Sequence, residues 1–125
     1  MARPASDWIA AQRTRDLLIR RLPGRGSRTT RSHLARAEFI GREIWRWRQI
    51  GPYQWQVNHL RWFLERKTNR LTPGVRYRYW LTVRLLVVAL GREADWLPHL
   101  LKGTWIRPSG ETGPLGQGRP VRLPR

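Results

Sequence analysis

The chain of 125 residues contains no cysteine, which excludes disulfides, thiolate metal sites and cysteine nucleophiles. Its longest apolar run, residues 85–90, is far shorter than the roughly 20 residues that span a bilayer. The N-terminal residues also lack the apolar stretch of a secretory signal. Together with the short length, these absences predict a soluble, cytoplasmic, single-domain protein without a membrane partner.

Acidic residues and lysine are both scarce. Only 8 Asp and Glu stand against 25 Lys and Arg, which gives a formal net charge of +17. Lys67 and Lys102 are the two lysines, so arginine supplies the other 23 cations. A GC-rich genome would explain arginine in place of lysine, but it would not explain the sign of the charge, because self-repulsion at this level opposes a compact state. The imbalance therefore favours a polyanionic partner, above all nucleic acid.

Eight tryptophans argue against general disorder, since disordered chains are poor in large aromatic residues. Apolar residues recur at helical spacing and strand-type alternation is weak, so the predicted fold class is all-α, a small bundle of four or five helices. Residues 1–31 are expected to form a basic N-terminal arm with one helix, and residues 32–103 the helical domain. Residues 104–125, rich in Gly and Pro, are expected to form a disordered basic tail.

Helix ends are marked by a few residues with capping preferences. Ser6 and Ser32 are placed to cap the first two helices, because a serine hydroxyl accepts the free N–H groups of a first turn. Thr72 and Pro73 mark the start of a later helix, and Gly91 is well placed at its end.

An aromatic stripe lies on the helix expected after residue 52. Trp55, His59, Trp62 and Arg66 follow one another at helical spacing, opposite much of the apolar face. Two tryptophans on a basic helix could stack on bases or ribose. In small bundles such residues more often pack against a neighbouring helix. The pattern leaves both interpretations open.

Cations and aromatic residues alternate in the run Arg76-Tyr77-Arg78-Tyr79-Trp80, directly after a helix start. Such a turn presents N–H groups and positive charge to phosphates. Two residues apart, Arg76 and Arg78 cannot point the same way, so one is expected to face DNA while the other braces an acid such as Glu65. The alternative is that both arginines are simply solvated.

Recognisable catalytic and metal-binding patterns are missing. His33, His59 and His99 lie far apart, with no acid at ligand spacing from any of them, so no metal site is predicted. The pair Glu93 and Asp95 is more simply explained as helix-start charge than as a catalytic pair. The chain also lacks a phosphate-binding loop with its lysine. We therefore predict a non-enzyme without a cofactor.

Residues 33–91 resemble the N-terminal core-binding domain of phage-type integrases (tyrosine recombinases), a small SAM-like helical bundle. The resemblance is carried by WRWR at residues 45–48, by WQVNHLRWFL at 55–64 and by the capped block LTPGVRYRYWLTVR at 71–84. It implies a module that clamps one face of duplex DNA. The family's catalytic domain needs an Arg, a His-x-x-Arg motif and a nucleophilic Tyr, whereas the 34 residues after Gly91 contain no tyrosine. A separate recombinase is thus an expected partner.

These observations predict a non-catalytic protein that clamps double-stranded DNA through Arg and Lys contacts to phosphates. RNA binding is one alternative, with exposed aromatic residues stacking on unpaired bases. A small regulator whose basic face docks on an acidic protein is the other. The residues expected to contact nucleic acid are Arg25, Arg28, Arg31, Arg61, Arg66, Lys67, Arg70, Arg76, Arg78 and Arg84.

Overall fold

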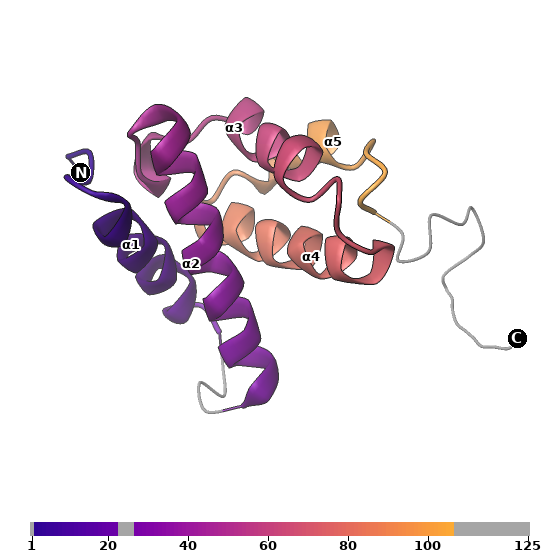
Figure 1. Ribbon diagram of the computed structural model, residues 1–125, viewed down its shortest axis with the longest axis horizontal. Helices are drawn as coiled ribbons and strands as arrows, with labels where there is room; N and C mark the ends of the chain where they lie inside the picture. Colours follow the sequence, from indigo (N-terminus) through magenta and orange to yellow (C-terminus); the bar gives the residue numbers. More distant parts are fainter. Residues whose placement is uncertain (1, 23–26, 107–125) are drawn as a thin grey trace, which may run out of the picture.

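The computed structural model describes residues 2–22 and 27–106, and this part of the chain is helical without any strand (Figure 1). It contains five α-helices, one 3-10 turn and one π-helical turn. In chain order these are α1 (Asp7–Ile19), α2 (Arg28–Arg48), η1 (Pro52–Gln54), α3 (Val57–Trp62), η2 (Phe63–Lys67), α4 (Pro73–Ala89) and α5 (Glu93–Leu100). The predicted all-α bundle is confirmed. Most of the predicted tail, from residue 107 onward, lies outside the described residues.

The first two helices begin at serine caps, but the second cap is not the predicted one. Ser6 caps α1 as expected, its hydroxyl oxygen accepting the N–H of Ile9 at 3.2 Å. Helix α2 begins at Arg28 because Ser27, with an extended backbone, accepts the N–H of Thr30 at 3.1 Å. The expected cap at Ser32 is therefore wrong, and the boundary placed at residue 31 falls inside α2.

Helix α1 packs along α2 as part of the bundle (Figure 1). Its buried face includes Leu17 and Leu18, and Gly41 of α2 lies directly against Ala10 and Thr14. A Cβ at Gly41 would lie 2.9 Å from the carbonyl oxygen of Ala10 and would overlap the side chain of Thr14. A glycine at this position lets the backbones of the two helices approach each other closely. The N-terminal helix is consequently a packed element rather than a separate arm.

Both ends of α4 follow the predicted capping chemistry. Thr72 caps the helix, its hydroxyl oxygen accepting a backbone N–H at 3.4 Å, and Pro73 occupies the first position. Gly91 follows the last turn with φ of 71°, a left-handed conformation that glycine adopts without strain. The N–H of Arg92 donates to the carbonyl of Val87 at 3.1 Å, which completes a Schellman motif.

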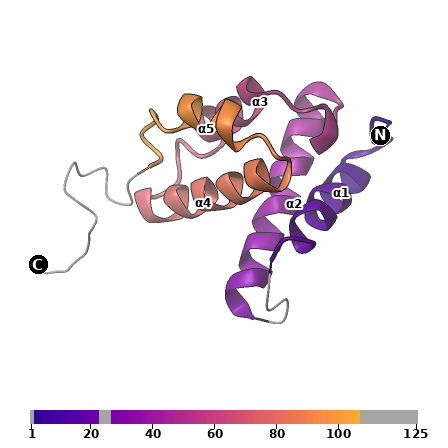
Figure 2. The same cartoon turned by 180° about the vertical axis from the view of Figure 1, so that it is seen from behind.

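The core lies where α2, α3, η2, α4 and α5 meet. The segment α3–η2 and α4 run in opposite directions, while α5 contacts both α3 and α4 (Figures 1 and 2). An aromatic group formed by Phe39, Phe63 and Tyr79 joins α2 to this pair, with ring centroids 5.7 to 5.9 Å apart. Among the described residues, the aliphatic and aromatic side chains with no exposed surface are Ala10, Leu18, Ala37, Ile40, Ile44, Leu60, Phe63, Leu64, Val83, Leu86, Val87 and Leu100.

Trp105 extends the packed structure beyond the predicted boundary. The tail was expected to begin at residue 104, but only 2 % of the Trp105 surface is exposed. Its indole Nε1 donates a hydrogen bond to the carbonyl oxygen of Leu100 at 2.9 Å. The start of the predicted tail is therefore wrong, because an anchored tryptophan joins this segment to the core.

Candidate nucleic-acid interface

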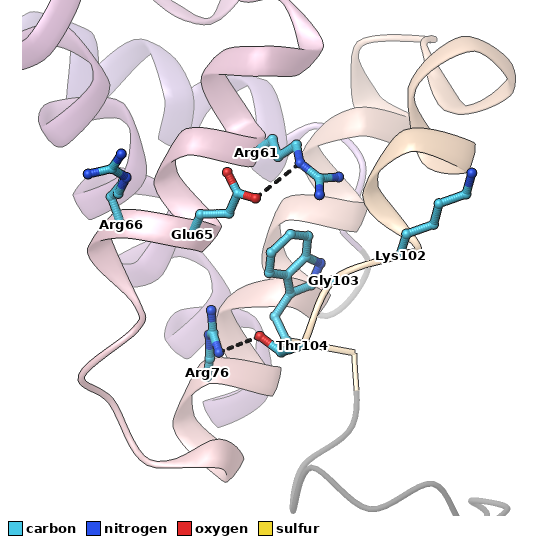
Figure 3. A pocket seen from close by; sticks show the side chains of 8 residues that line it. Arg61, Glu65, Arg66, Arg76, Lys102, Gly103 and Thr104 are labelled. Carbon is cyan, nitrogen blue, oxygen red and sulfur yellow. Dashed lines mark hydrogen bonds and ion pairs between the residues drawn. The ribbon is translucent and has the colours of Figure 1, made fainter.

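An open pocket of about 440 Å³ lies between the end of η2, the first turn of α4 and the segment after α5 (Figure 3). It brings together three cations chosen from the sequence, Arg61, Arg66 and Arg76, and adds Lys102, which the sequence did not single out. The complete lining is Arg61, Glu65, Arg66, Arg76, Lys102, Gly103, Thr104 and Trp105. Whether each of these cations is available to bind an external anion depends on the hydrogen bonds and ion pairs that it already makes within the protein.

Arg61 is held by contacts within the protein. Its Nε lies 3.2 Å from Oε2 of Glu65, and its Nη1 donates to the carbonyl oxygen of His99 at 2.6 Å. The guanidinium carbon also lies 5.5 Å from the ring centroid of Trp105, within cation–π range. Arg61 therefore ties α3 to the end of α5.

Arg76 is also held by contacts within the protein, but its partners do not include Glu65, the acid that the sequence suggested. Its Nη2 donates to the carbonyl oxygen of Leu64 at 3.2 Å and its Nε to the hydroxyl of Thr68 at 3.0 Å. A third contact joins Nη1 to the hydroxyl of Thr104 at 2.7 Å (Figure 3). The carbonyls at a helix end lack intrahelical partners, and that of Leu64 accepts hydrogen bonds from both the Thr68 hydroxyl and Arg76. Arg76 thereby connects η2, α4 and the final segment.

Lys67 is the third predicted contact residue with an internal partner. Its Nζ lies 3.1 Å from Oε1 of Glu43, whose other carboxylate oxygen lies 3.1 Å from Nη1 of Arg46. The Glu43 side chain is only 11 % exposed, so both cations compensate a carboxylate largely removed from water. This interaction connects η2 to α2.

The remaining predicted contact residues differ in kind. Arg25 lies outside the described residues. The other six are exposed and make neither an ion pair nor a side-chain hydrogen bond with any residue that the structure describes; they are Arg28, Arg31, Arg66, Arg70, Arg78 and Arg84. Of Arg76 and Arg78, the first turns inward and the second stays exposed, as the two-residue spacing requires.

The aromatic stripe is occupied by contacts between side chains of the bundle. Trp55 is 3 % exposed, and Trp62 stacks on Trp47 of α2 with ring centroids 4.0 Å apart and planes 7° from parallel. The edge of His59 meets Trp47 at 5.8 Å. Because Trp62 covers one face of Trp47, the Arg48 guanidinium, 4.2 Å from that ring, lies over the opposite face. The packing interpretation of this stripe is the one that the structure supports.

A second cationic group, at the junction of α2 and α4, was not found from the sequence. Arg36 donates through Nε to the hydroxyl of Thr82 at 2.8 Å, and its Nη2 lies 3.2 Å from Nδ1 of His33. Nδ1 of His33 is itself 2.8 Å from the Thr82 hydroxyl oxygen. Burial, with the adjacent charge of Arg36, lowers the pKa of His33, so the imidazole favours its neutral form. An arginine and a histidine one turn apart are too common a pattern to reveal such a site.

Comparisons of the chain with protein-family models, with curated proteins and with solved structures found no match. Among the residues that the structure describes, no group of three or more His, Asp or Glu side chains is arranged to hold a metal ion. In the same residues, no helix is both long and apolar enough to cross a membrane. Function must therefore be inferred from the chain's own side chains.

Proposed function

We propose that this protein binds double-stranded DNA, without catalysis of its own, through contacts from arginine and lysine to backbone phosphates. The observation that carries the proposal is a set of six exposed arginines, chosen from the sequence, that have no partner among the residues that the structure describes. Arginine is well suited to this contact, since its planar fork can donate two hydrogen bonds to one phosphate.

Internal compensation of the charge is too small to remove the need for an external anion. Within residues 2–22 and 27–106 the ion pairs use five acids, Asp7, Glu38, Glu43, Glu65 and Asp95. The full chain has only 8 acids against 25 cations. Self-repulsion between the uncompensated cations is relieved when they bind a polyanion.

Duplex DNA is favoured over single-stranded RNA by the state of the aromatic stripe. Base stacking needs free ring faces, but within the stripe Trp55 is buried, Trp62 lies against Trp47, and Arg48 covers the other face of Trp47. The exposed aromatic residues Trp8 and Tyr53 lie outside the stripe, on α1 and η1. The resemblance of residues 33–91 to integrase core-binding domains points to the same ligand. In this proposal the protein acts in the cytoplasm as a clamp that works beside a separate recombinase.

The salt dependence of duplex binding tests the proposal. Each neutralised phosphate releases condensed counterions, so affinity falls steeply as salt rises. We expect fluorescence anisotropy with a labelled duplex to show a loss of more than about tenfold between about 50 and about 200 mM salt. A smaller loss would contradict the phosphate clamp. Tighter binding to single-stranded RNA, or to an acidic protein alone, would instead select one of the two alternatives.

A pair of charge-matched variants tests whether the surface near the α3–α4 turn is used. We expect Arg66→Gln combined with Arg70→Gln to weaken duplex binding more than Arg20→Gln combined with Arg21→Gln. All four arginines are exposed, and the control pair lies at the end of α1, away from that turn (Figure 1). Both variants remove two positive charges, so a bulk-charge effect cancels. Equal losses would show that binding is diffuse.

A further inference from the structure

The junction of α2 and α4 holds an arginine with unused hydrogen-bonding capacity. A guanidinium carries five N–H donors. In Arg36, Nε serves the Thr82 hydroxyl at 2.8 Å and one Nη2 hydrogen serves His33 Nδ1 at 3.2 Å. No residue that the structure describes accepts from the remaining donors. Because Arg36 is partly buried, these donors have fewer waters available than those of a free surface arginine.

Arg78 is the second cation of the junction, and no carboxylate of the described residues pairs with it or with Arg36. Arg78 is exposed on α4, and its positive charge adds to burial in lowering the pKa of Arg36, although the nearby Tyr79 acts in the opposite direction. None of the ion pairs among the described residues includes Arg36 or Arg78. Two like charges held together in this way are stabilised when an anion binds between them.

Helix geometry places Arg78 on the face of α4 that Arg36 contacts. Arg78 and Thr82 lie four residues apart and therefore occupy one face of α4. Arg36 approaches that face from α2, where Thr82 fixes its Nε–H. The Thr82 hydroxyl also lies 3.2 Å from the carbonyl oxygen of Arg78, within hydrogen-bond distance. The contact from α2 thus falls within one helical turn of Arg78.

We propose that the α2–α4 junction is a phosphate site in which Arg36 and Arg78 together bind one phosphate group of the DNA backbone. This inference rests on the proposed function and adds a defined contact to it. Thr82 and His33 position the Arg36 guanidinium, and the neutral His33 does so by accepting a hydrogen bond at Nδ1. A phosphate presents several acceptor oxygens and a negative charge, which match the unused donors and the uncompensated charge.

The site is tested first with inorganic phosphate, followed through the ring resonances of His33 in NMR spectra. The chain has three histidines, and the set of ring resonances that disappears in the His33→Gln variant is assigned to His33. We expect a saturable change with phosphate and none with chloride at matched ionic strength. Arg36→Gln and Arg78→Gln should each weaken this response by about tenfold or more, the usual effect of losing a charged hydrogen bond. Arg20→Gln, which changes an exposed arginine at the end of α1 without a side-chain partner among the described residues, should leave it unchanged. A response equal to that with chloride would overturn the site.

Duplex binding then separates this inference from the proposed function. If the unmodified protein binds duplex DNA, and Arg78→Gln weakens binding more than Arg20→Gln, both are supported. If these two variants bind DNA equally, the junction site is overturned while DNA binding stands. If phosphate binds at the junction but duplex DNA does not bind the protein, the site stands and the proposed function is overturned. The Arg78 side chain has no hydrogen-bond or ion-pair partner within residues 2–22 and 27–106, so its variant remains informative even if Arg36→Gln impairs folding.

Discussion

Replacement of Trp105 by alanine measures how far the packed structure extends toward the C-terminus. Only 2 % of the Trp105 surface is exposed, and core replacements of Trp or Phe by Ala cost about 3–5 kcal/mol. We expect about 4 kcal/mol, because the change also removes the hydrogen bond to Leu100 and two cation–π contacts, from Arg61 and Arg76. For a bundle of this size that loss lowers Tm by roughly 15 °C or more.

Urea denaturation followed by circular dichroism gives the free energy of unfolding, with Trp8→Ala as the matched control. Trp8 is 69 % exposed, so the same substitution there should change stability by less than about 0.5 kcal/mol. Trp105→Phe keeps an apolar ring but loses the indole N–H, and should fall between the two. Equal stabilities of the Trp105→Ala and Trp8→Ala proteins would refute the anchoring role and restore a tail that begins at residue 104.

Two further results are expected, one for packing and one for pH. Gly41→Ala should cost about 1–3 kcal/mol in a thermal melt, because the new methyl group overlaps Thr14, whereas Gly74→Ala, with nothing within 4 Å of its Cβ, should be neutral or slightly stabilising. Burial lowers the pKa of both His33 and His59 from 6.5, so the unfolded chain binds more protons as the pH falls through that value. The free energy of unfolding should therefore decrease between about pH 7.5 and about pH 5.5, and the decrease should be smaller in His33→Gln. A melt series showing no such decrease, or a decrease unchanged in the variant, would contradict the buried neutral imidazole.

The helix ends that could be predicted are those fixed by a neighbouring residue. Ser6, Thr72 and Gly91 act within one turn of their own helices, so their chemistry is visible in a short stretch of sequence. Ser27 also caps its own helix, but it lies among Gly, Pro and Arg residues typical of a linker. The composition of this stretch therefore indicated a loop where the second helix begins. No residue type marks the π-helical turn at residues 63–67, because that distortion depends on contacts made elsewhere.

The fate of each arginine could not be predicted, because it depends on partners that are distant in the sequence. Arg76 and Arg78 look equivalent in the sequence, yet Arg76 is held by Thr104, 28 residues away, while Arg78 stays exposed. Arg61 reaches a carbonyl of His99, 38 residues away. Charge composition therefore predicts that a cationic surface exists, while tertiary contacts, including those of Trp105 with Arg61 and Arg76 and that of Glu43 with Lys67, determine which cations are held internally.

The stacked pair of Trp47 and Trp62 has an optical consequence. Two indoles 4.0 Å apart and nearly parallel have electronic transitions that couple, which splits their circular-dichroism band into components of opposite sign. A tryptophan without such a neighbour contributes a single band, so the split signal reports on this pair even in a chain with eight tryptophans. Since one ring belongs to α2 and the other to α3, the protein carries an intrinsic, label-free probe of the distance and angle between those helices.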